Sequence, residues 1–145
     1  MIAPTKLQVL RVTREFETSP DALFDAWTNP DMVGRWLFTT PGSESHSVEA
    51  DVRPGGKWTI TDIREGVEYK AVGEYLDVDR PGRLVFTFGM PQFSPALHKV
   101  TVEINATDKG AQLTLIQEGL PPEAIRPLEQ GWREMFDMLA VILHG

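Results

Sequence analysis

The amino-acid sequence predicts an α+β protein in which an antiparallel sheet of seven strands curves around one long C-terminal helix. The last stretch, Ile125–Leu143, has apolar residues at the i, i+3, i+4, i+7 spacing of one helical face. The middle of the chain instead alternates between apolar and polar residues, and tight turns separate the alternating segments. Successive strands joined by tight turns pair antiparallel. The helix cannot bury so wide an apolar face alone, so we expect the sheet to cover it.

The first third of the chain predicts one strand and two short helices. Residues 7–16 are rich in β-branched side chains and predict a strand. Ser19-Pro20-Asp21 combines an N-cap serine, a proline for the first helical position and an acid in the first turn. Asn29-Pro30-Asp31 repeats this signal, so two short helices are expected to turn sharply against each other. Residues 38–45, rich in Thr, Pro, Gly and Ser, predict a loop.

Six more strands are predicted before the final helix. Pro-Gly turns are expected at 53–56 and 79–82, and a glycine-containing hairpin turn at 107–110. Gly73 inside one strand suggests a bulge. The predicted strands are 47–52, 57–63, 68–78, 83–88, 97–106 and 111–118.

Composition limits the possible functions. The chain has 145 residues, so we expect one domain over residues 1–145, large enough to bury a core. It has no cysteine, which excludes disulfides and thiolate chemistry. A formal charge of −7 argues against binding to nucleic acid. We expect no signal peptide and no membrane span, and a cytoplasmic location.

Several short motifs together resemble a known superfamily. They are Ser19–Pro30, Arg35-Trp36, Arg53–Trp58, Gly73–Leu76, Arg83–Phe88, and Gly131-Trp132 with Leu139 beyond. In this order and spacing the chain, from about Leu7 to Leu143, resembles the SRPBCC or START-like superfamily, which has the Bet v 1-like helix-grip fold. Within it, the chain is similar to the branch named after the activator of the heat shock protein 90 ATPase.

The resemblance implies a cavity between the curved sheet and the C-terminal helix. Members of the superfamily bind hydrophobic small molecules such as lipids in this cavity, so this chain is expected to bind such a ligand. Two alternatives stay open: a cyclase- or hydrolase-type enzyme using the same cavity, and a chaperone-interacting stress-response protein. The eukaryotic namesake engages the chaperone through an additional N-terminal domain for which this chain is expected to have no room, which argues against chaperone stimulation.

Aromatic and aliphatic residues form the candidate cavity. Alternation places Trp58 and Ile60 on one strand face, and Leu84, Phe86 and Phe88 on another. Facing the helix, these side chains would line an apolar pocket; alternatively, they fill the space as an ordinary core. The full candidate set is Trp58, Ile60, Tyr75, Leu84, Phe86, Phe88, Trp132, Phe136 and Leu139. Tyr75 is ambiguous because Val72, Leu76 and Val78 favour the opposite face of its strand.

Two polar residues are candidates for the same cavity. Asp62 shares the phase of Trp58 and Ile60, and a carboxylate buried among aromatic rings could act as a general acid or base. The ordinary interpretation is that Asp62 lies at the solvated end of its strand. His98 could reach the cavity mouth, although a surface position is the simpler interpretation.

Other chemistry has little support in the sequence. His46, His98 and His144 lack the spacing of a metal site. No nucleophile or nucleotide-binding motif is present, so we predict no metal, no cofactor and no assigned catalytic residue. The sequence carries no signal for an oligomeric state.

Overall fold

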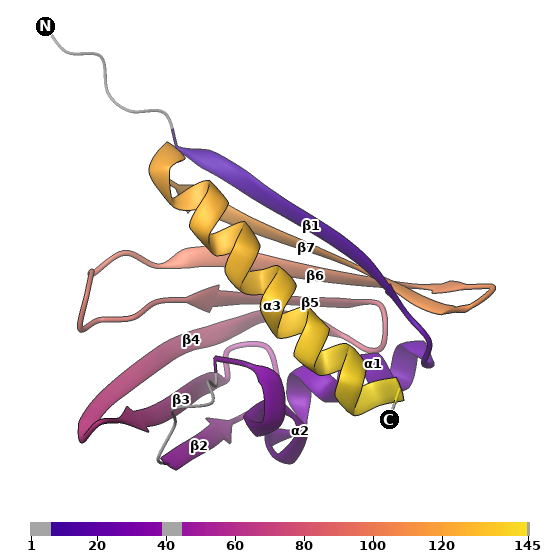
Figure 1. Cartoon of the computed structure of the whole chain (residues 1–145), viewed down its shortest axis with the longest axis horizontal. Helices are drawn as coiled ribbons and strands as arrows, with labels where there is room; N and C mark the ends of the chain where they lie inside the picture. The colour runs from indigo at the N-terminus through magenta and orange to yellow at the C-terminus, as the bar shows by residue number, and fades with distance from the viewer. Residues whose placement is uncertain (1–6, 39–44, 145) are drawn as a thin grey trace, which may run out of the picture.

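The computed structural model describes residues 7–38 and 45–144 and confirms the predicted fold class (Figure 1). Its strands form an antiparallel seven-stranded sheet in the order β1-β7-β6-β5-β4-β3-β2. The elements are β1 (Gln8–Phe16), α1 (Pro20–Thr28), α2 (Pro30–Trp36), β2 (Ser45–Ala50), β3 (Lys57–Arg64), β4 (Val67–Asp79), β5 (Arg83–Phe88), β6 (His98–Thr107), β7 (Gly110–Leu120), a 3-10 turn (Pro122–Ala124) and α3 (Ile125–His144).

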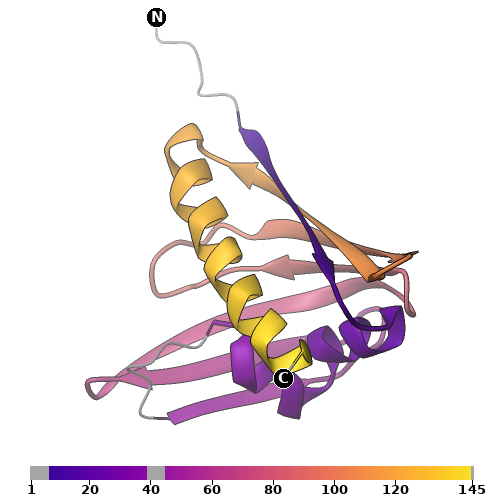
Figure 2. The ribbon, with the colours of Figure 1, turned by 45° about the vertical axis from the view of Figure 1, so that its right-hand side comes forward.

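The long helix crosses the hollow face of the sheet. Figures 1 and 2 show α3 running diagonally over the strands, with α1 and α2 beside its C-terminal end. Helix α3 buries Trp132, Phe136, Leu139 and Ala140 against the sheet and the short helices, as its apolar spacing predicts. Within residues 7–38 and 45–144, no helix combines the length and the apolar character needed to cross a membrane.

The two short helices begin as their capping residues predict. The Ser19 hydroxyl accepts a hydrogen bond from the Ala22 backbone N–H at 3.1 Å. Asn29 serves both helices: its side chain accepts from the Asp31 N–H at 3.0 Å, and its own N–H donates to the Asp25 carbonyl at 2.8 Å. One residue therefore ends α1 and starts α2, which produces the sharp turn.

Strand β4 bends where it changes its main partner. Residues 67–74 pair with β3, and residues 75–79 pair with β5. The irregularity in register lies between Tyr75 and Asp77, so the bulge expected at Gly73 is wrong by a few residues. This irregularity lets both Tyr75 and Val78 contact the core, while Leu76 is 47% exposed. Strict alternation could not place Tyr75 because the strand's phase changes beside it.

Gly73 instead allows close approach of the backbones. A Cβ at this position would lie 1.8 Å from the Thr87 carbonyl oxygen and 2.5 Å from the Trp58 Nε1. Only a residue without a side chain fits between β5 and the Trp58 ring. The predicted loop 38–45 falls mostly on residues 39–44, outside the described residues.

Candidate functional site

The centre of the space between helix and sheet is filled by aromatic rings. Trp27 of α1 packs edge-on against Trp36 of α2, with ring centroids 4.8 Å apart. Trp27 also contacts Trp132 at 5.9 Å and Phe136 at 6.2 Å, both on α3. Large rings from all three helices therefore meet in one packed cluster, and this part of the predicted cavity is core.

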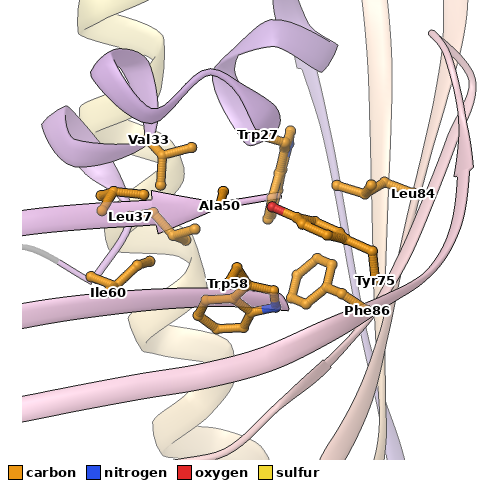
Figure 3. A pocket seen from close by; sticks show the side chains of 10 residues that line it. Trp27, Val33, Leu37, Ala50, Trp58, Ile60, Tyr75, Leu84 and Phe86 are labelled. Atoms are coloured by element: carbon orange, nitrogen blue, oxygen red, sulfur yellow. The ribbon is translucent and has the colours of Figure 1, made fainter. Parts of the chain in front are cut away.

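A small cavity remains between this cluster and the sheet (Figure 3). Its volume is about 20 Å³, which is room for about one water molecule. Five of the predicted cavity residues border it: Trp58, Ile60, Tyr75, Leu84 and Phe86. A space of this size cannot hold a drug-sized ligand.

The phenol of Tyr75 lies among these apolar side chains, with its oxygen toward the cavity in Figure 3. Burial, together with the smaller effect of the negative charge of Asp51, raises the pKa of Tyr75 to about 12. Tyr75 is therefore a neutral hydrogen-bond donor throughout the physiological pH range.

A second, much larger pocket lies between α3 and strands β3 and β4. Its volume is about 450 Å³, within the range of roughly 300–1,000 Å³ that is common for small-ligand sites. Most of its wall is apolar, and the polar side chains are those of Asp62, Arg64, Tyr69 and Glu134. The lining residues are Phe38, Ile60, Asp62, Arg64, Tyr69, Ala71, Met90, Gly131, Glu134, Met135 and Met138.

The predicted site residues are thus divided between several environments. Of the predicted apolar set, Ile60 borders both pockets. Trp132, Phe136 and Leu139 are buried in the core and border neither of the two pockets. Phe88 lines neither pocket, but its ring stacks on that of Phe38, a lining residue of the larger pocket, with ring centroids 4.8 Å apart. The sequence analysis missed most of the residues that line the larger pocket.

Gly131 is the one missed residue with a clear signal in the sequence. A glycine in the interior of a helix costs about 1 kcal/mol relative to alanine. Here a Cβ on Gly131 would meet no atom within 4 Å, because the residue borders the larger pocket. Packing against a neighbour therefore does not require this glycine, whereas an open pocket does benefit from it.

Replacing Gly131 by alanine is expected to stabilise the protein by about 0.5–1 kcal/mol. The methyl group enters open space, and the unfolded chain loses conformational freedom. Urea denaturation of both proteins measures the change. A loss of stability would show that the space beside Gly131 is not open.

Asp62 is buried, so the interpretation that it lies at a solvated strand end is wrong. The residue is 2% exposed and lines the larger pocket. Its Oδ1 lies 3.1 Å from the Nδ1 of His46, its direct partner in the β2–β3 pairing, and its Oδ2 pairs with Arg64. Two neighbouring hydrogen-bond donors therefore satisfy a carboxylate that burial alone would disfavour.

Phe38 has a strained backbone beside the same pocket. Its φ of 55° is rare for a bulky residue. Its N–H donates to the Met135 sulfur at 3.4 Å, and its carbonyl accepts from Arg64 Nη2 at 3.4 Å. Helix α3 and strand β3 thus hold this residue in place from both sides.

His98 is half-buried and forms the outer end of a hydrogen-bonded chain that begins at the buried Trp132. The Trp132 Nε1–H donates to Gln117 Oε1 at 2.9 Å, and Gln117 Nε2 donates to His98 Nδ1 at 3.2 Å. The indole is a donor only, so it fixes the orientation of the amide, which in turn requires an unprotonated Nδ1 on His98. His98 borders neither of the two pockets.

Acidification is expected to weaken the fold through His98. Burial lowers the pKa of His98 below its ordinary value, so the neutral form is preferred in the folded state. Its stabilising contribution is complete above the unfolded value of about 6.5 and is lost as the pH falls through the folded pKa. The free energy of unfolding of the wild type, relative to His98→Gln, should therefore decrease between about pH 8 and pH 5. A difference that does not change with pH would contradict this prediction.

The geometry defines a class of protein: a helix-grip domain whose large pocket lies between the long helix and two strands of the sheet. The family model described as Activator of Hsp90 ATPase homolog 1-like protein matches residues 17–144, and the chain belongs to this family. The resemblance stated from the motifs is therefore confirmed. A comparison with curated proteins finds no match.

Solved structures share the same fold. Protein CV1439 from Chromobacterium violaceum is 23% identical, with a TM-score of 0.78 over 94% of this chain and 97% of that chain. SA2116 from Staphylococcus aureus, described as a protein of unknown function, is 22% identical, with a TM-score of 0.84 over 97% of this chain and 95% of that chain. A protein from Rhizobium leguminosarum is 19% identical, with a TM-score of 0.81 over 99% of both chains. At these identities the likeness extends to the fold alone.

Proposed function

We propose that this protein binds a hydrophobic small molecule in the pocket between α3, β3 and β4. The observation that carries the proposal is the pocket of about 450 Å³ with a largely apolar wall. The ligand would contact the apolar side chains of Phe38, Ile60 and Ala71 and those of three methionines. These methionines are Met90, Met135 and Met138. Their flexible thioether side chains adapt to ligands of different shapes.

Two further features support this assignment. Gly131 leaves the helix surface open at the pocket despite the cost of a helical glycine. Phe38 keeps an unfavourable backbone conformation at the pocket wall, and such strain is concentrated at ligand-binding and catalytic sites.

Uptake of a neutral fluorescent probe, N-phenyl-1-naphthylamine, tests the proposal. Its emission should rise on binding to the wild type. Gly131→Phe should abolish the increase, because the new ring enters the pocket from the helix. Gly131→Ala is the matched control, since it makes the same backbone change without filling the volume and should bind the probe as the wild type does.

Two results would contradict the proposal: no uptake by the wild type, or unchanged uptake by Gly131→Phe. Native mass spectrometry of the protein as purified, followed by extraction, would identify a retained natural ligand. A released apolar compound that is absent from Gly131→Phe would supply the ligand's chemical class directly.

The enzyme alternative depends on the pairing of Asp62 with His46. A carboxylate that orients a histidine is a common catalytic arrangement, and the Nε2 of His46 has no hydrogen-bond partner among the described residues. However, His46 packs beside Gly34 of α2 and borders neither pocket, so a ligand in the larger pocket would not reach it. We therefore propose that His46 and Asp62 hold Arg64 in place rather than act on a ligand. No contact in the described residues favours chaperone binding over a small ligand.

A further inference from the structure

Strand β3 contributes two charged side chains, Asp62 and Arg64, to the wall of the larger pocket. Ile60, Asp62 and Arg64 alternate along β3, so their side chains share a face and all three line the pocket. The sheet thus places the Arg64 guanidinium beside the Asp62 carboxylate in a largely apolar pocket.

Neighbouring groups fix the orientation of this guanidinium. Its Nε donates to Asp62 Oδ2, and its Nη2 donates to the Phe38 carbonyl oxygen at 3.4 Å. The Tyr69 ring lies 5.2 Å from the guanidinium carbon, a cation–π contact. Hydrogen bonds along the edge of the Arg64 guanidinium and a ring against its face therefore fix its orientation before a ligand binds. The side chain then loses less conformational entropy on binding.

The guanidinium keeps unused donors in this position. Arginine has only donors, and Arg64 Nη1 has no hydrogen-bond partner within residues 7–38 and 45–144. Each oxygen of the neighbouring Asp62 already has a partner, His46 on Oδ1 and Arg64 on Oδ2. At this end of the pocket Arg64 therefore offers hydrogen-bond donors, and a ligand with an oxygen acceptor would complement them.

Building on the proposed function, we infer that the ligand is an apolar molecule with a neutral carbonyl or hydroxyl oxygen, which accepts a hydrogen bond from Arg64. The apolar part occupies the space beside Gly131 and the methionines. The hydrogen bond to a charged donor would fix the direction in which the ligand enters.

The charges of the pocket favour a neutral group over an ionised one. The lining carries two carboxylates, Asp62 and Glu134, and one guanidinium, Arg64. A ligand carboxylate at Arg64 would bring another negative charge beside Asp62 in a largely apolar space, which is unfavourable. A ligand ammonium would bring a second positive charge beside the Arg64 guanidinium, which is unfavourable as well.

Competition between probes of equal chain length tests this inference. The probes are 2-decanone, decanoate and decylamine, each used to displace N-phenyl-1-naphthylamine from the wild type. We expect 2-decanone to displace it at the lowest concentration. Arg64→Met, which keeps the apolar stem, should weaken binding of 2-decanone at least tenfold and weaken binding of the fluorescent probe far less, because the probe carries no oxygen acceptor.

Arg133→Met is the matched control. Arg133 stands between the lining residues Gly131 and Glu134 in the sequence, but its side chain is exposed, pairs with Glu129 and does not line the pocket. Its loss removes the same charge from the protein and should leave the affinity of every probe unchanged.

The failure of this inference can be distinguished from that of the proposed function. If decanoate or decylamine binds as tightly as 2-decanone, or Arg64→Met binds 2-decanone normally, the inference is overturned while uptake of the fluorescent probe still supports the pocket. If the wild type takes up no probe, both are overturned. Should circular dichroism show Arg64→Met unfolded, the ranking of the three probes on the wild type decides alone.

Discussion

Replacement of Trp132 by alanine is expected to destabilise the protein by about 3–5 kcal/mol, a large share of the stability of a protein this size. The indole is 2% exposed and contacts Trp27, Phe38 and Phe136, so its removal leaves a cavity among packed rings. The lost hydrogen bond to Gln117 adds to the cost. Urea denaturation followed by circular dichroism measures the effect.

A double-mutant cycle separates packing from hydrogen bonding at Trp132. Trp132→Phe keeps a ring but leaves the buried Gln117 Oε1 without its donor, at an expected cost of about 1–3 kcal/mol. Adding Gln117→Leu should recover part of this loss because both polar partners are then absent. If the double variant is as unstable as the sum of the single variants, the hydrogen bond contributes nothing specific.

Replacement of Gly73 by alanine is expected to cost at least about 3 kcal/mol, beyond the usual range for one added methyl group. The new Cβ would lie 1.8 Å from the Thr87 carbonyl oxygen, and backbone atoms of a paired strand cannot move away independently. The Trp58 ring would also have to shift, since its Nε1 is 2.5 Å from the same position. Denaturation with urea would detect the loss.

Gly131→Ala is the natural control for Gly73→Ala, because the same substitution is expected to have the opposite sign in the two places. One glycine is enclosed by backbone and an indole, and the other faces open space. A Gly73→Ala variant within about 1 kcal/mol of the wild type would refute the close packing described for β4.

Most of the fold could be predicted from the sequence because its signals are local. The capping residues Ser19 and Asn29 begin the short helices, and the apolar spacing of Ile125–Leu143 defines the last helix. Turn residues separate the strands, and the antiparallel order follows from short connections. The bulge near Tyr75 could not be located, since it depends on how β4 changes partners rather than on a local residue pattern.

The pocket could not be placed from the sequence. Alternation identifies side chains that face the helix, but a pocket wall and a packed core have the same pattern. Trp27 and Trp36 decide which part of the space is filled, and they come from helices whose docking is a tertiary property. The burial of Asp62 likewise depends on the register that brings His46 opposite it. Fixing that register requires the three-dimensional pairing of β2 with β3.

The placement of the tryptophans affects how this protein can be studied by spectroscopy. All four are at most 6% exposed, and none of them lines the larger pocket. Their intrinsic emission should therefore be that of indoles shielded from water, and it should report on loosening of the aromatic cluster. A ligand that enters beside Gly131 would change this emission little, so titrations that rely on tryptophan quenching would miss a true binder.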